Sequence, residues 1–427
     1  MSEIASTEGR RIWDSRGRPT IEVEVTTIDG AVGRGIAPAG ASKGTREALE
    51  LRDGGKRFGG LDVQNALAGI RNEIAPALFG MDVSNQTDID ALMISLDGTP
   101  NRARLGGNAL IATSLAVLHA AAAHARKPLW QYLANGGPTS LPLPQIQIFG
   151  GGAHAGRRVD VQDFMIIAVG AQSFAQALEM TAEVYRAAGE LMVKRNGRAG
   201  VADEGGWWPN FNRNEDALDL IVEAIAAAGF EPGREVGIAL DIAASEFGHG
   251  GRYRLALEDA ELDSDGLCEK LLSWLERYPI VSIEDPLSED DEAGLIAFTR
   301  AVAGRVQVVG DDYLVTNAGL VAAAAAKGAC NAVLIKPNQA GTVTETRAAL
   351  DAAKKAGYAT IVSARSGETE DVAIVHLATG WNAGQLKVGS FSRSERMAKW
   401  NEGLRIESAA ENPDRFAGAG AMFQLQR

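Results

Sequence analysis

The chain has 427 residues and a formal net charge of −13. This acidic balance excludes the basic face that nucleic-acid binding needs, and the length is sufficient for two domains. Two cysteines, Cys268 and Cys330, are too few for a disulfide framework, and the N-terminal stretch lacks the apolar core of a signal peptide. We therefore expect a cytoplasmic protein that binds neither nucleic acid nor membranes.

The first segment opens with a hairpin pattern at residues 19–35, "PTIEVEVTTIDGAVGRG". Apolar and polar residues alternate there before an Asp-Gly turn, which predicts two antiparallel strands. The stretch at residues 108–125, "NALIATSLAVLHAAAAHA", is the most apolar helical sequence, but it is too short and too polar for a membrane span and predicts a buried helix. Loop residues near 136–142 then separate a first domain, residues 1–138, from a second, residues 139–427.

The second segment repeats one pattern: a short apolar run that leads to a charged residue, then a helical stretch. Strands that are apolar along their whole length are typical of a parallel sheet or barrel buried on both faces. Functional groups at the carboxyl ends of successive strands are typical of a (β/α)8 barrel active site, whereas a doubly wound open sheet is the alternative. The pattern favours the barrel. The charged residues are Asp241, Glu284, Asp311, Lys336, Arg365 and Lys387.

Three of these residues are carboxylates: Asp241, Glu284 and Asp311. In a barrel they would converge on one spot, and converged carboxylates repel one another unless a cation holds them. Oxygen ligands of this number suit Mg²⁺. The alternative for each residue alone is a solvated helix cap after its strand.

Two lysines, Lys336 and Lys387, come from later strands of the same face. A lysine beside a divalent cation and another lysine loses its proton more readily, so Lys336 is a candidate general base. Arg365 and Ser366 form a pair of the kind that binds a phosphate. Ordinary salt bridges are the alternative for an isolated lysine at such a position.

Two glycine-rich loops carry further candidates. "ADEGGWWPN" places Glu204 close to two tryptophans, whose apolar rings would favour the neutral acid and a role as proton donor. "GGAHAGRRVDVQDF" carries His154, Arg157, Arg158 and Asp163 in what we expect to be a mobile loop. A surface glutamate and a structural histidine are the alternatives.

Taken together these stretches resemble the enolase family over essentially the whole chain. The matching segments include "DSRGRPTIEVEV", "ADEGGWWPN", "SIEDPLSEDD", "LIKPNQAGTVTET" and "SARSGETED". The resemblance implies a small α+β N-terminal domain, an enolase-type (β/α)8 barrel with irregular first strands, and a homodimer. It also implies Mg²⁺ on the three carboxylates, Lys336 as base, Glu204 as acid, Lys387 on the substrate carboxylate, and Arg365 with Ser366 on the phosphate.

Several positions depart from the family pattern at the site. Ala364 stands where that pattern has His, Ala39 where it has Ser, Asp163 where it has Glu, Phe149 where it has Asn, Lys43 where it has Thr, and Trp208 where it has Ala. The missing histidine and the shortened acid belong to the family's machinery around the departing hydroxyl. Losing one acid-base group costs a factor of about 10² to 10⁴ in rate.

These departures lead to three hypotheses about function. The first is a divergent Mg²⁺-dependent enzyme that joins a three-carbon phosphoacid to a second anionic substrate, as in carboxyphosphonoenolpyruvate synthase of phosphonate antibiotic pathways. Lys43, Arg157 and Arg158 would then bind the second anion. The second hypothesis is ordinary dehydration of 2-phosphoglycerate to phosphoenolpyruvate, and the third is a non-catalytic binding protein on the same fold. All three expect small anionic phosphorylated ligands.

Overall fold

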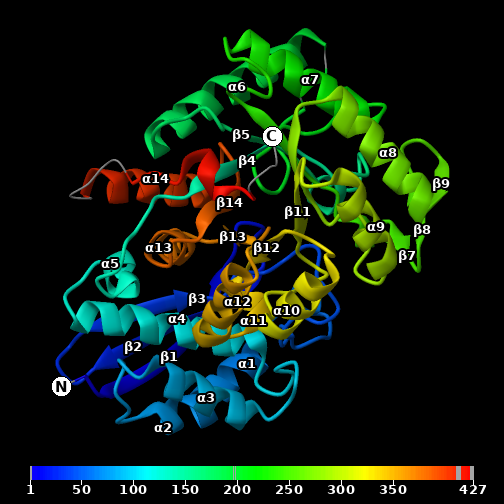
Figure 1. Ribbon diagram of the computed structural model, residues 1–427. Helices are drawn as coiled ribbons and strands as arrows, with labels where there is room; N and C mark the ends of the chain where they lie inside the picture. Colours follow the sequence, from blue (N-terminus) through cyan, green and yellow to red (C-terminus); the bar gives the residue numbers. More distant parts are fainter. Residues whose placement is uncertain (1, 196, 198, 410–414, 424–427) are drawn as a thin grey trace.

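A computed structural model describes residues 2–195, 197, 199–409 and 415–423. Figure 1 shows two parts: a three-stranded sheet with its helices at the N-terminal end of the chain, and a ring of strands and helices formed by the remainder. The ring is a closed eight-stranded barrel. The expected α+β domain followed by a (β/α)8 barrel is therefore confirmed.

The N-terminal sheet is antiparallel and has the order β1-β2-β3. It comprises β1 (Ile4–Trp13), β2 (Pro19–Thr27) and β3 (Val32–Ile36), the last two being the predicted hairpin. The predicted apolar helix is α4 (Gly107–His124), which packs on this sheet with nearly all of its side chains buried. Shorter helices surround it: α1 (Gln64–Gly69), α2 (Ala75–Leu78), α3 (Gln86–Asp97) and α5 (Leu129–Ala134).

Glycines allow β3 and α4 to approach so closely. A Cβ atom on Gly33 would lie 2.1 Å from the backbone nitrogen of Ala120, and one on Gly35 would lie 2.4 Å from the carbonyl oxygen of Ala112. Real Cβ atoms do not reach such distances, so the backbones can touch only where side chains are absent.

The barrel strands follow one another around the ring in chain order. They are β4 (Leu143–Gly150), β5 (Asp163–Ile167), β6 (Gly237–Asp241), β10 (Ile280–Glu284), β11 (Gln307–Gly310), β12 (Ala332–Ile335), β13 (Ala359–Ser363) and β14 (Gly384–Ser390). The predicted domain boundary at residues 138 and 139 lies in the connection between α5 and β4.

One strand of the barrel runs in reverse. β5 is antiparallel to both β4 and β6, while the other neighbouring pairs are parallel. Consequently Asp163, the first residue of β5, lies opposite Asp241, the last residue of β6. A residue that begins a strand thus reaches the same rim as residues that end their strands.

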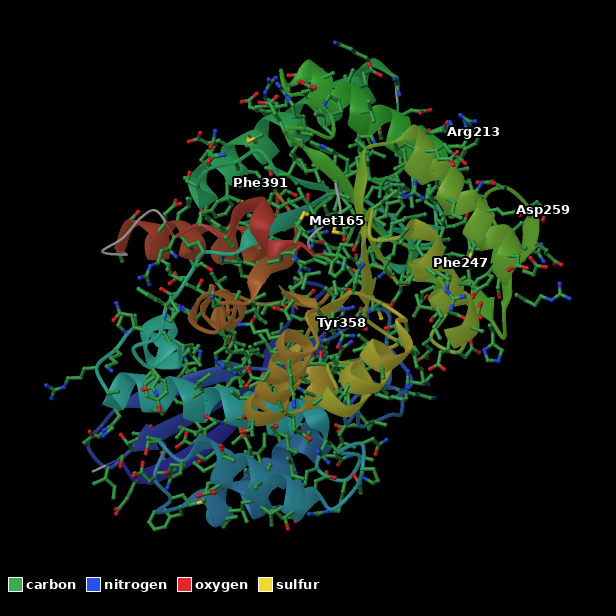
Figure 2. The ribbon with its side chains drawn as sticks, in the orientation of Figure 1. Met165, Arg213, Phe247, Asp259, Tyr358 and Phe391 are labelled. Atoms are coloured by element: carbon green, nitrogen blue, oxygen red, sulfur yellow. The ribbon has the colours of Figure 1, made fainter. Side chains whose placement is uncertain are left out.

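The helices cover the outside of the barrel in Figure 1. They are α6 (Phe174–Lys194), α7 (Asn214–Ala227), α8 (Ser264–Arg277), α9 (Glu292–Val302), α10 (Ala318–Lys327), α11 (Pro337–Ala340), α12 (Val343–Lys355), α13 (Ala373–Gly380) and α14 (Ser394–Ala409). A small sheet of β7 (Gly248–His249), β8 (Arg252–Leu255) and β9 (Ala260–Asp263) lies at the outer edge, where Figure 2 labels Asp259. Among the described residues, no helix has the length and hydropathy required to traverse a lipid bilayer.

The end of the barrel opposite the charged rim is filled by an apolar cluster and by hydrogen-bonded glutamines, among them Gln307 and Gln385. Met165, labelled inside the ring in Figure 2, packs with Leu143, Ile167 and Ala239 of neighbouring strands and with Met422 near the C-terminus. The barrel is therefore a packed core, and its polar rim is the end available for chemistry.

Candidate active site

A small cavity of about 20 Å³ lies at the polar rim of the barrel. Side chains from the strand ends and from the loop at Ser42 of the N-terminal domain line it. Eight of the predicted site residues contribute to its wall: His154, Asp163, Glu204, Asp241, Lys336, Arg365, Ser366 and Lys387. The topology thus brings together residues that are more than 200 positions apart in the sequence.

The three predicted metal carboxylates lie beside the two lysines. Lys387 Nζ is 2.8 Å from Asp241 Oδ2 and 2.7 Å from Glu284 Oε2, and Lys336 Nζ donates to Asp311 Oδ2. All five side chains are buried. Lys387 lies within β14, not at its end, because the strand continues past an irregularity in register to Ser390.

Burial and mutual repulsion control the charges of this cluster. Burial, followed by the charge of Asp241, raises the pKa of Glu284 well above its usual range. Burial opposes the charged forms of Lys336 and Lys387, but the neighbouring carboxylates raise the pKa of both lysines. Both lysines are therefore charged in this arrangement, and their positive charges neutralise the carboxylates that they contact.

The donor set fits Mg²⁺. Three carboxylates offer the oxygen ligands that this ion prefers. Glu284 Oε1 is buried and has no hydrogen-bond partner, so one lone-pair site in the described structure faces no donor. In the described part of the chain, the carboxylate oxygens of Asp241, Glu284 and Asp311 do not all lie within 4.8 Å of one another. Lys387 Nζ donates to two of the three carboxylates, Asp241 and Glu284.

His154 is the centre of a second group. Its Nδ1 lies 2.9 Å from Asp163 Oδ1 and its Nε2 lies 3.0 Å from Ser366 Oγ, with Glu204 Oε1 at 3.7 Å. Gln147 donates to the same Asp163 oxygen. Our expectation that His154 lies in a mobile loop is wrong: the ring is buried at 5% exposure and hydrogen-bonded through both nitrogens.

The charge of His154 follows from these neighbours. Burial favours the neutral ring, but Asp163 and then Glu204 raise the pKa of His154 to about 9. Burial likewise opposes the ionised carboxyl of Asp163, yet His154 holds the pKa of Asp163 below its usual range. Although the atoms of His154, Asp163 and Glu204 are close enough for a metal, a protonated imidazole has no lone pair to give, so this group suits proton donation.

The first tryptophan after Glu204, Trp207, packs on α6. Its ring stacks on Tyr185, with centroids 4.7 Å apart, and its Nε1 donates to the Tyr185 carbonyl. Glu204 Oε1 lies 3.7 Å from His154 Nε2. The imidazole is therefore an ionisable neighbour of Glu204.

Arg365 also lines the cavity, and the N-terminal domain holds its side chain in place. Its guanidinium donates to Glu47 Oε2 at 2.9 Å and to the Ser42 carbonyl at 2.9 Å, both in the N-terminal domain. A Cβ atom on Gly40 would lie 2.0 Å from Arg365 Nη2, so the loop of the N-terminal domain can lie against Arg365 only with glycine there. Arg365 and Ser366 both face the cavity, as a phosphate-binding pair requires.

The three basic residues expected on a second anion lie outside this cavity's wall. Arg157 is 65% exposed and forms an ion pair with Glu246, and Lys43 pairs with Glu50. Arg158 donates to Asn210 Oδ1 at 3.3 Å and is partly buried. Each of the three side chains thus pairs with another residue, and none of them lines the cavity.

Two further departures from the family pattern are Ala364 and Phe149. Ala364 lines the cavity, as do His154 and Arg365, and contributes only a methyl group to its wall. Phe149 is fully buried in β4 and packs edge-on against Phe211, with ring centroids 5.1 Å apart. Only the first of these two changes the groups available to a ligand.

Sequence reasoning missed three buried polar residues behind the site: Glu47, Thr316 and Gln339. Gln339 donates to Asp311 Oδ1 at 2.9 Å, and Thr316 Oγ1 accepts from the backbone N–H of Lys336 at 2.9 Å. Gln339 lies only three residues beyond a strand-end lysine, which is a signal that could have indicated it. Glu47 comes from the other domain and carries no such signal.

Comparison with known proteins gives two family matches and relatives that include one similar over its full length. Residues 4–133 match the family described as enolase, N-terminal domain, and residues 138–425 match enolase, C-terminal TIM barrel domain. "Enolase 1" of Desulfitobacterium hafniense (strain Y51) is 47% identical over 431 residues, which cover 99% of this chain and 98% of that protein.

Proposed function

Since this chain belongs to the enolase family, whose lyases depend on Mg²⁺, we propose that it removes water from 2-phosphoglycerate to form phosphoenolpyruvate. Dehydration was the alternative kept open by the sequence. The full-length likeness to a protein named enolase favours it over the joining of two substrates.

One observation carries the proposal: a single cavity is lined by Lys336, by the Glu204 and His154 pair, and by Arg365 with Ser366. Removing water across a carbon–carbon bond requires a base for the carbon-bound proton and an acid for the departing hydroxyl. It also requires cations where negative charge develops. The cavity wall holds a candidate for each of these tasks.

The proposed roles follow from position and charge. Arg365 and Ser366 bind the phosphate and Lys387 binds the substrate carboxylate, while Lys336 removes the proton from the adjacent carbon. Lys336 has to lose its proton for this step: Asp311 raises its pKa, whereas the nearby positive charges of Arg365 and Lys387 oppose that rise. The bound Mg²⁺ would supply stabilisation of negative charge on the carboxylate, with Asp241, Glu284 and Asp311 as its ligands.

In this proposal Glu204 and His154 carry out the acid step. Glu204 protonates the departing hydroxyl, and His154, held by Asp163, returns a proton to Glu204. His154 Nε2 and Glu204 Oε1 lie 3.7 Å apart, which is ion-pair distance, so the exchange requires them to move closer, to hydrogen-bond distance. Asp163 fills the role assigned to the longer acid in the family pattern, because β5 brings it to the rim.

The test is direct formation of phosphoenolpyruvate from 2-phosphoglycerate with Mg²⁺. We expect turnover that stops when the metal is chelated and resumes when Mg²⁺ is restored. A chain that binds Mg²⁺ and 2-phosphoglycerate without forming product contradicts the proposal. A chain that binds neither would instead support a non-catalytic role.

The joining of a second anionic substrate is the second candidate, and the small side chain of Ala364 in the cavity wall favours it. Incubation with phosphoenolpyruvate or 2-phosphoglycerate and nucleotide-activated phosphonoformate tests for a joined product. Replacing Arg157 and Arg158 by Ala should then reduce only the joining rate. The ion pair of Arg157 with Glu246 and the hydrogen bond of Arg158 to Asn210 count against this candidate.

A homodimer and a cytoplasmic location remain proposals. The homodimer rests on resemblance to the family, and the location rests on the two cysteines, both of which are free thiols. Size-exclusion chromatography with light scattering decides the first.

A further inference from the structure

Gln339 is a buried amide whose hydrogen-bonding groups are all used. Its Nε2 donates to Asp311 Oδ1 at 2.9 Å and to Glu47 Oε1 at 3.2 Å, and its Oε1 accepts from Thr316 Oγ1 at 2.7 Å. The residue is 2% exposed. Because each contact uses a different donor or acceptor position, the amide has one orientation that satisfies all three partners.

Thr316 secures the other end of this network. Its hydroxyl donates to Gln339 and accepts from the backbone N–H of Lys336 at 2.9 Å. Both Val315 and Thr316 have a positive φ, 42° and 52°, which is costly for β-branched residues. The surrounding contacts therefore hold the Thr316 hydroxyl where its own backbone preference would not place it.

Glu47 extends the network into the N-terminal domain. Its carboxylate accepts from Gln339 and forms a two-point pair with Arg365, at 2.9 and 3.2 Å. A continuous chain of buried contacts thus runs from Asp311 through Gln339 and Glu47 to Arg365. It connects a carboxylate of the proposed metal site with the arginine of the proposed phosphate site.

We propose that Gln339 is a positioning residue that couples the metal carboxylate Asp311 to the phosphate-binding Arg365. This inference rests on the proposed function for the roles of those two residues. Gln339 fixes the rotamer of Asp311 so that one oxygen stays available for Mg²⁺, and through Glu47 it fixes the guanidinium. Removing its amide should weaken both sites at once, although it touches neither ligand.

The decisive variant is Gln339→Leu, which keeps similar bulk and removes every hydrogen bond. Hydrogen-bond partners behind a metal ligand typically account for about 10-fold to 100-fold in metal affinity. We expect Mg²⁺ affinity by calorimetry to fall by about that factor, and affinity for inorganic phosphate to fall with it. Gln307→Leu is the matched control, since Gln307 is an equally buried, hydrogen-bonded glutamine at the far end of the barrel.

Thr316 supplies a second, gentler test. Thr316→Val removes the hydroxyl and should reproduce part of the loss, while Thr316→Ser retains the hydroxyl and should stay within about twofold of the parent. Thr360→Val is its control, because Thr360 is a buried strand residue whose hydroxyl bonds the Ala383 carbonyl. If Gln339→Leu does not fold by circular dichroism, the Thr316 pair decides.

Several outcomes overturn the proposal. Mg²⁺ and phosphate affinities of folded Gln339→Leu within about twofold of the parent would do so, as would an equal loss in Gln307→Leu, or a parent that binds no Mg²⁺. Failure of the proposed function is seen separately, because a parent that forms no phosphoenolpyruvate still allows both titrations to decide the role of Gln339.

Discussion

At the scale of single residues, the site depends on pairs of opposite charge held out of water. Lys387 contacts Asp241 and Glu284, and His154 contacts Asp163, all of them buried. Buried pairs of this kind contribute little net stability, yet breaking one leaves an uncompensated charge that costs about 3 to 5 kcal/mol. The site therefore tolerates change poorly, which gives single substitutions clear outcomes.

Lys336 is the residue whose proposed role is most sharply testable. If Lys336 removes the proton next to the substrate carboxylate, Lys336→Ala should abolish exchange of that proton with solvent deuterium, while 2-phosphoglycerate still binds. Loss of a general base lowers turnover by about 10² to 10⁴. Deuterium exchange, followed by proton NMR, measures the effect, and exchange that persists in the variant would assign the base to another group.

His154 predicts a pH dependence of stability. Asp163 and Glu204 raise its pKa from 6.5 in the unfolded chain to about 9 in the folded protein. The stabilisation is thus fully present below about pH 6.5 and is lost as the pH rises through about 9, an effect on the order of 3 kcal/mol. We expect the unfolding temperature of the parent to fall over this window relative to that of His154→Gln. Parallel pH profiles of the two proteins would be inconsistent with a charged His154.

At the scale of elements, close packing of helix and sheet determines where the N-terminal loop can lie. β3 and α4 touch through backbone atoms at Gly33 and Gly35, which anchors the sheet that carries the loop with Ser42 and Glu47. From this loop Ser42 lines the cavity and Glu47 pairs with Arg365. The small domain thus contributes to a site built mainly by the barrel.

Gly35→Ala tests this contact. The added methyl group would meet the Ala112 carbonyl oxygen at 2.4 Å and the Ala116 nitrogen at 2.5 Å, so α4 or the sheet has to shift. Overpacking of this kind costs about 1 to 3 kcal/mol, which thermal unfolding detects as a lower midpoint. Gly420→Ala is the control, because nothing lies within 4 Å of its Cβ position. Equal midpoints for the two variants would show that the contact can relax freely.

At the scale of the whole molecule, the closed barrel converts spacing in the sequence into proximity. Each apolar run leads to a charged residue, and closure brings Asp241, Glu284, Asp311, Lys336 and Arg365 to one rim. The N-terminal domain covers part of this rim through Glu47. The arrangement is therefore a property of the fold as a whole, because no single element carries two of these groups.

The sequence by itself determined the features that depend on local pattern. Alternation of apolar and polar residues predicted the hairpin of β2 and β3, and a predominantly apolar stretch predicted buried α4. The recurring strand and helix stretches predicted the barrel and its rim of charges. These features follow from side-chain periodicity and burial, which short segments already contain.

Contacts between distant segments could be identified only from the folded structure. The reversal of β5, which places Asp163 opposite Asp241, leaves no trace in a strand of one aspartate and four apolar residues, because strand direction depends on neighbouring strands. The burial of His154, the outward pairing of Arg157 and the link from Glu47 to Arg365 likewise depend on residues far away in sequence. Hydrogen bonds and ion pairs of this kind join two residues that are far apart in the sequence, whereas composition and periodicity describe one segment at a time.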